Sequence, residues 1–165
     1  MKTNQEWKSY RFNHVIHISS KNVIFNKRIE SNAVEKSIIH PYSFTFNPKA
    51  WDKNTLCIKT HNGGENLEIF NLKGQNISHG DIYSSLISAR HGFGNTEGMF
   101  VVGDKNKTIL FTCDMASSAL IPSIVYKEML NTYFFRLQYS AQEMDETVKS
   151  KKNISINIKL SISFN

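Results

Sequence analysis

Alternation of apolar and polar residues is the dominant pattern along the chain. In ISINIKLSISF, residues 154–164, every even position is apolar, while the odd positions are Ser, Asn or Lys. A period of two places all the apolar side chains on one face of a strand, as in an antiparallel sheet that is covered on one side only. This segment therefore predicts a β-strand with one buried face.

Two β-hairpins are also predicted. TLCIKT (55–60) and NLEIFNL (66–72) flank a turn in which Asn62, Gly63 and Gly64 suit the positive φ of a tight reversal. MFVVG and KTILFTC flank a second reversal. Further strands are expected where β-branched and aromatic residues gather, at residues 10–19, 21–29, 42–47 and 132–140.

Two helices are expected between these strands. One is predicted over residues 81–91 and another over roughly 115–130, where Pro122 must start or kink the regular part. The second rests on an apolar stripe at helical spacing, formed by Ile124, Val125, Met129 and Leu130. The segment NAVEKSIIH, residues 32–40, adds one or two further turns.

These elements predict an α+β fold that is predominantly antiparallel β, a sandwich or flattened barrel of about eight strands with two helices. The chain has 165 residues, of which 40% are hydrophobic, and it contains no internal repeat and no linker rich in Pro or Gly. A chain of this size and composition can bury a substantial core. We therefore expect a single β-rich globular domain spanning residues 1–165.

Charge and cysteine content narrow the classes of function. Twenty Lys and Arg against 14 Asp and Glu give a net charge of +6, which favours an acidic partner, a nucleic acid or an anionic surface. Neither Cys57 nor Cys113 has metal-ligand spacing, so no metal and no cofactor are expected. Two buried thiols are the simpler interpretation, and a disulfide between neighbouring strands is the alternative.

The location of the protein is inferred from what the chain does not contain. MKTNQEWKSY has no apolar signal-peptide core, and no segment approaches the roughly 18 apolar residues of a membrane span. We expect no membrane insertion, and either a cytoplasmic location in the producing cell or export by a leaderless route.

The stretch ISHGDIYSSLISARHGFGNTEG, residues 77–98, is the strongest candidate for chemistry, and two interpretations compete for it. In the first it is a capped helix, with Ser78 and Asp81 at the start and Arg90 and His91 at the end. In the second, His79 and His91 are an acid–base pair. Twelve residues of continuous helix separate two imidazoles by about 18 Å, too far to act on one scissile bond. We favour the capped helix.

Part of this stretch, GDIYSSLISARH, is similar to the segment around the second active-site histidine of some viral uridylate-specific endoribonucleases. The similarity covers about a dozen residues: a Gly-Asp pair, and a histidine ten residues after the aspartate. The family's first histidine would fall on Asn76, and its catalytic lysine has no clear counterpart. The resemblance implies a ribonuclease whose acid–base pair is broken here, and we do not assign the chain to that family.

A second candidate group lies near the start of the chain. Trp7, Lys8, Tyr10 and Arg11 interleave aromatic and basic side chains, a composition that can bind single-stranded nucleic acid. The alternative is an N-terminal strand whose aromatic side chains point into the core, and we prefer it. His14 and His17 are expected on opposite faces of the same strand, so they cannot hold one metal ion together.

Three functions follow from these observations. We favour a non-enzymatic interaction or structural module that acts through its surface or its sheet edges, as an effector, an inhibitor or a component of a viral or secretion assembly. Its partner would be another protein or a second copy of the chain. The first alternative is a small metal-independent ribonuclease or phosphodiesterase that uses His79 and His91, with Arg90 and Lys105 or Lys107 contacting phosphate. The second alternative is a nucleic-acid-binding domain.

Overall fold

The computed structural model describes residues 1–7, 10–31, 41–61, 63–78, 95, 97–114, 116, 120–141 and 154–165. Within these ranges twelve strands form two sheets, and every strand pairing is antiparallel. The helical structure in these ranges is a single 3-10 turn, η1, at Pro48–Ala50. The prediction of a β-rich, antiparallel protein is therefore confirmed.

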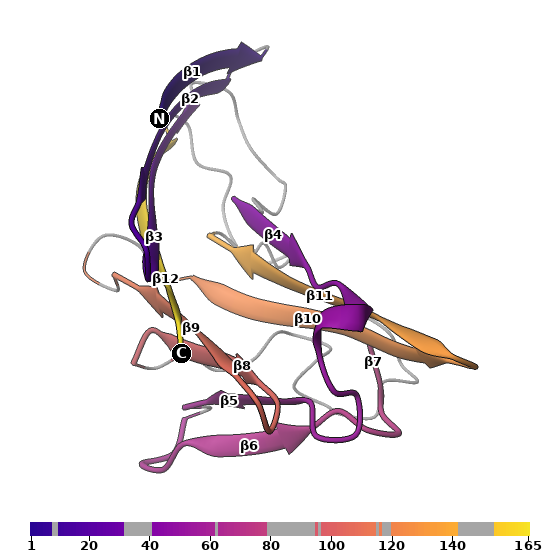
Figure 1. Cartoon of the computed structure of the whole chain (residues 1–165). Helices are drawn as coiled ribbons and strands as arrows, with labels where there is room; N and C mark the ends of the chain where they lie inside the picture. The colour runs from indigo at the N-terminus through magenta and orange to yellow at the C-terminus, as the bar shows by residue number, and fades with distance from the viewer. Residues whose placement is uncertain are drawn as a thin grey trace.

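The larger sheet has eight strands and is called the large sheet (Figure 1). Its order across the sheet is β1-β2-β3-β12-β9-β8-β5-β6. The bounds are β1 Lys2–Trp7, β2 Tyr10–Ile18, β3 Asn22–Ser31, β5 Cys57–Thr60, β6 Glu68–Asn71, β8 Met99–Gly103, β9 Thr108–Cys113 and β12 Ile154–Phe164. Both predicted hairpins are present, as β5 with β6 and as β8 with β9.

The smaller sheet has four strands in the order β4-β11-β10-β7 and is called the small sheet. Its strands are β4 Tyr42–Thr45, β7 Asn76–Ser78, β10 Ile121–Met129 and β11 Thr132–Ser140. The small sheet lies on the concave side of the curved large sheet (Figure 1). The first two strands of the large sheet extend beyond it.

Alternation along the strands places the core between the two sheets. On β12, Ile158, Leu160 and Ile162 are buried, whereas the intervening Lys159 is exposed. Register carries this inward face across the large sheet, because Leu160 lies opposite Phe25 on one neighbour and Cys113 on the other. The apolar face predicted for residues 154–164 thus covers the protein's own core.

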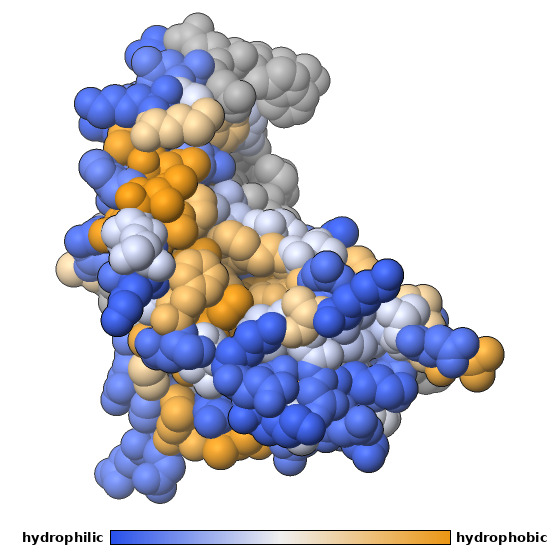
Figure 2. Space-filling model, viewed as in Figure 1, coloured by the Kyte–Doolittle hydropathy of each residue, from blue (hydrophilic) through white to orange (hydrophobic). Residues whose placement is uncertain are grey.

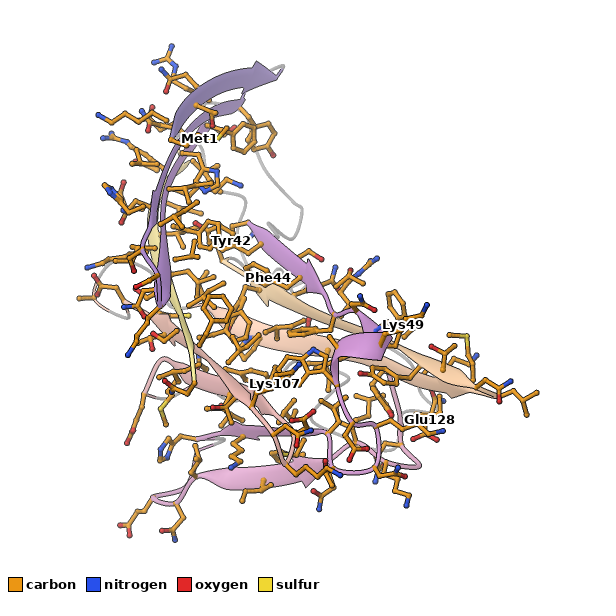
Figure 3. All side chains as sticks on the ribbon, in the orientation of Figure 1. Met1, Tyr42, Phe44, Lys49, Lys107 and Glu128 are labelled. Atoms are coloured by element: carbon orange, nitrogen blue, oxygen red, sulfur yellow. The ribbon has the colours of Figure 1, made fainter. Side chains whose placement is uncertain are left out.

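Aromatic side chains make the contact between the sheets. Phe111 of β9 lies 5.3 Å from Phe44 of β4 and 6.2 Å from Tyr139 of β11, measured between ring centroids. Phe25 of β3 lies 5.5 Å from Tyr42 of β4. Figure 3 shows Tyr42 and Phe44 on the side of β4 that faces the large sheet. These ring spacings are the range in which aromatic pairs add stability beyond their buried area.

The helix predicted over residues 115–130 is wrong, because Ile121–Met129 is strand β10, paired with β11 on one side and β7 on the other. From Ile124 onward burial alternates, with Ile124 and Tyr126 buried and Val125 and Lys127 less so, while Met129 and Leu130 of the helical stripe are exposed. Pro122 lies outside the part of β10 that pairs with β7, a position at which a strand tolerates the missing N–H.

Other predictions fall where the structure gives no description. The helix predicted over residues 81–91 and the turns predicted over residues 32–40 lie outside the described residues. Strands β1 and β7 were not predicted as separate elements. Each is short and polar, with the sequences KTNQEW and NIS, so neither carries a readable alternation.

Replacing Phe111 by Ala should destabilise the protein by about 3–5 kcal/mol, since it opens a cavity between the sheets. Thr112 is exposed on the opposite face of the same strand, so Thr112→Ala should change stability by less than about 0.5 kcal/mol. Urea unfolding monitored by circular dichroism measures both values. Equal effects of the two variants would show that Phe111 does not join the sheets.

Candidate functional site

The residues that the sequence singled out for catalysis lie outside the described part of the chain. This applies to His79, Arg90 and His91, and also to Lys8 of the N-terminal aromatic and basic group. Two further members of that group can be placed on β2. Tyr10 is half-buried and packs against the core, whereas Arg11 is exposed on the other face. Trp7 ends β1, paired with Tyr10.

A cluster of titratable side chains occupies the inward face of β2 and β3, where they meet the start of β4. Lys27 donates a hydrogen bond to the carbonyl of Pro41 at 3.0 Å, and its Nζ lies 5.5 Å from the ring of Tyr42 and 5.7 Å from that of Phe12. His14 lies opposite Lys27 in the strand register. The lysine therefore ties the large sheet to the first residues of the small sheet.

Burial changes the acid–base properties of this cluster. Desolvation lowers the pKa of Lys27. Desolvation, and then the charge of Lys27, lower the pKa of His14. Burial raises the pKa of Tyr42. His14 Nε2 and the Tyr42 hydroxyl are buried and accept or donate no hydrogen bond among the described residues. The lowered pKa favours a neutral His14 imidazole, which packs against the rings of Phe25 and Tyr42. This is a packing role.

The two cysteines are free thiols on the large sheet. Cys113 is buried, and its burial raises the pKa of the thiol to about 12. A weak hydrogen bond from Asn95 Nδ2, at 3.8 Å, lowers this pKa by less than burial raises it. A thiol held protonated in this way is a poor nucleophile. Desolvation also raises the pKa of Cys57, which is half-buried on β5. Neither environment is that of an activated cysteine.

The most distinctive surface of the described residues surrounds η1 and is rich in lysine. We call it the lysine surface and define it as Lys49, Lys53, Lys73, Lys105 and Lys107. Its members come from η1 and the loop after it, from the turn before β7, and from the turn between β8 and β9. Figure 2 shows hydrophilic residues gathered on the face around η1 and the loop that follows it.

Contacts between these segments hold the lysine surface together. The Lys105 Nζ forms an ion pair with Asp52 at 3.0 Å, and the Asp52 backbone N–H donates to Asp104 Oδ2 at 2.8 Å. Lys107 donates to the carbonyl of Ala50, with its Nζ 4.8 Å from the Trp51 ring centroid. The turn between β8 and β9 is therefore fastened to the segment that carries η1.

The carboxylates on this surface are occupied by internal hydrogen bonds. Asp104 accepts backbone N–H bonds from Asp52, Asn106 and Lys107. Glu128 accepts a bond from the Gly74 backbone N–H at 3.0 Å and another from the Tyr126 hydroxyl. Gly74 has a φ of +73°, a conformation that suits glycine and that aims its N–H at the carboxylate.

These bonds keep the carboxylates ionised. The hydrogen bond from Lys105 is the main cause of the lowered pKa of Asp52. At Asp104 partial burial opposes ionisation, but three backbone N–H bonds outweigh it and the pKa is lowered. The Gly74 bond lowers the pKa of Glu128. Three carboxylates thus serve as fixed anchors, and the five lysines lie around them, four exposed and Lys53 half-buried.

Sequence patterns could not have found this surface. Its five lysines lie in four separate segments, none of which contains a basic run. From the sequence, Lys105 and Lys107 are expected only as phosphate contacts for the segment at residues 79–91. The readable signal is the pair of aspartates that begin turns, Asp52 and Asp104, each of which accepts from the backbone N–H two residues later.

Comparisons with known proteins give no relative: the chain matches no family model, no curated protein and no solved structure. Among the described residues, no three His, Cys, Asp or Glu side chains are grouped so as to hold a metal ion. In the same part of the chain, no helix has the length and apolarity needed to cross a membrane. The site must therefore be interpreted from its own geometry.

His14→Phe should weaken the dependence of stability on pH. Because the folded-state pKa of His14 is lowered from 6.5, the unfolded chain binds the proton more readily. The wild-type protein should therefore lose stability as the pH falls from 6.5 to the lower folded-state value, and the variant should lose less. Urea midpoints measured across this range test the prediction. Asn13→Ala, which removes no titratable group, should retain the wild-type slope, and an unchanged slope in His14→Phe would contradict the assignment.

Asp104→Ala should destabilise the protein by about 1.5–3 kcal/mol at neutral pH, since charged hydrogen bonds to three backbone N–H groups are lost. A lowered pKa means that this contribution is present above the ordinary value of 3.8 and is lost as the pH falls through the folded-state pKa. The two proteins should therefore become more alike in acid. Glu65→Ala, an exposed change in another turn, is the control and should have little effect on the urea midpoint.

Proposed function

We propose that this chain is a non-enzymatic interaction module that binds an acidic partner through the lysine surface. The observation that carries the proposal is the excess of lysines around η1, where the neighbouring carboxylates are already engaged by backbone N–H groups. Lys105 and Lys107 are engaged by Asp52 and by the Ala50 carbonyl, whereas Lys49, Lys53 and Lys73 are left to contact an anionic partner. Clustered positive charge also steers such a partner during encounter.

The proposal treats residues 1–165 as one β-rich domain whose two sheets form a sandwich. Buried side chains from both sheets belong to one hydrophobic cluster, which supports this view. A rigid sheet scaffold with function placed on its turns is a common arrangement for binding proteins. Here the turns that carry the lysines are held by Asp52, Asp104 and Glu128.

The interior titratable groups support a binding role over catalysis. Cys113 and Tyr139 are buried, and burial raises the pKa of both. Lys27 is held by Pro41 and two aromatic rings, so it acts as a link between strands. A catalytic group needs a pKa near the working pH and access to substrate, and these groups lack that combination.

Binding to two acidic probes, polyglutamate and a single-stranded oligonucleotide, tests the proposal by fluorescence anisotropy. The variant Lys53→Glu/Lys73→Glu should weaken binding by more than about tenfold, because it reverses two charges within the surface. The matched control Lys21→Glu/Lys159→Glu makes the same net change at exposed positions elsewhere and should weaken binding by about twofold. Affinity should also fall steeply as salt rises.

Two outcomes would contradict the proposal. Equal loss in the two double variants would mean that net charge, and not this surface, determines binding. Cleavage of RNA by the wild-type protein that is lost in His79→Ala or His91→Ala would establish an enzyme in place of the module.

A further inference from the structure

The hairpin formed by β10 and β11 ends in an exposed apolar tip. Met129 pairs with Thr132, so Leu130 and Asn131 form a two-residue turn. Leu130 is 94% exposed and Met129 is 47% exposed. Polar and glycine residues usually occupy such turns. In Figure 1 this end of the hairpin projects from the body, and in Figure 2 it is hydrophobic beside hydrophilic neighbours.

Among the described residues, no further strand pairs with either side of the hairpin end. β7 pairs with β10 only up to Lys127, and β4 pairs with β11 only from Arg136 onward. Between these limits β10 and β11 pair with each other, and the Phe135 carbonyl also accepts a hydrogen bond from the Phe46 N–H. The apolar tip is therefore a convex projection that the described strands do not cover.

Basic side chains surround the base of this projection. Lys127 is exposed on the same face as Met129, and Arg136 stacks on Phe134 there, with its Cζ 5.1 Å from the ring centroid. On the other face Lys53 and Lys73 act on Glu128, whose carboxylate is held by Gly74 and Tyr126. We call Lys53, Lys73, Lys127 and Arg136 the basic collar.

We propose that the hairpin tip and the basic collar bind the surface of a membrane that contains anionic lipids. Leu130 and Met129 would enter the headgroup layer while the collar contacts the lipid phosphates and carboxylates, with no segment crossing the bilayer. This proposal rests on the proposed function, because Lys53 and Lys73 belong to both the collar and the lysine surface. Apolar and basic groups placed side by side are the combination that peripheral membrane binding requires.

The shape of the tip favours a lipid surface over other acidic partners. A folded protein would need a pocket complementary to a projecting leucine, whereas a fluid headgroup layer adapts to it. A nucleic acid would engage the collar but would gain nothing from Leu130 at the end of the turn. The effect of replacing Leu130 should therefore distinguish a lipid surface from a nucleic acid as the partner.

Co-sedimentation of the full chain with vesicles tests the proposal. The wild-type protein should bind phosphatidylcholine vesicles that contain phosphatidylserine, and should bind vesicles of phosphatidylcholine alone only weakly. Leu130→Asn should lower the partition coefficient by about tenfold, and Lys127→Gln by about fivefold. The matched control is Ile18→Asn, since Ile18 is 76% exposed at the end of β2, away from the hairpin, and this variant should bind like the wild type. Circular dichroism verifies that each variant is folded.

An oligonucleotide arm separates this proposal from the proposed function. Leu130→Asn should bind the oligonucleotide as tightly as the wild type does. If the wild type binds oligonucleotide but not anionic vesicles, the membrane proposal is wrong and the interaction module stands. If it binds neither vesicles, oligonucleotide nor polyglutamate, both proposals fail. Equal vesicle binding by the wild type and Leu130→Asn would also overturn the membrane proposal.

Discussion

The large sheet has one apolar face, and that face must be covered by the small sheet if its strands are to stay paired. Phe111 stands at the centre of this contact, because its ring meets Phe44 and Tyr139 from two strands of the small sheet. Each ring reaches the interface only if its strand keeps its register, since a slip of one residue turns every side chain to the opposite face. Packing between the sheets and pairing within them therefore stabilise each other.

Charged side chains have different roles on the inner side of the sheets and on the surface turns. On the inner side, Lys27 lies near the rings of Phe12 and Tyr42 and joins β3 to the residue before β4 through a hydrogen bond to the Pro41 carbonyl. Outside, carboxylates are used to fasten turns, and lysines are left exposed around them. The net charge of +6 comes from 20 Lys and Arg against 14 Asp and Glu, and the basic residues in excess are spread along the chain.

Much of the fold could be predicted from a period of two, and the exceptions have physical causes. β12 has six alternating apolar residues and was predicted in full. β10 was predicted as a helix because Ile124, Val125, Met129 and Leu130 also fit helical spacing. In the structure the first is core, and the last two form an exposed tip. The lysine surface was not predictable, because it depends on turns that are distant in sequence and are brought together by the pairing of β5 with β8.

The central position of β12 has a consequence for synthesis of the chain. One side of the large sheet is β1-β2-β3 and the other is β9-β8-β5-β6, and β12 is the strand that joins them. It pairs Ile162 with Val23 on one side and with Phe111 on the other, and it follows every other described strand in the sequence. Until β12 has been synthesised, the two sides of the large sheet cannot be joined, and the edges of β3 and β9 that β12 later covers remain unpaired. The sheet closes only after this last strand has left the ribosome, which makes closure a late and non-local step.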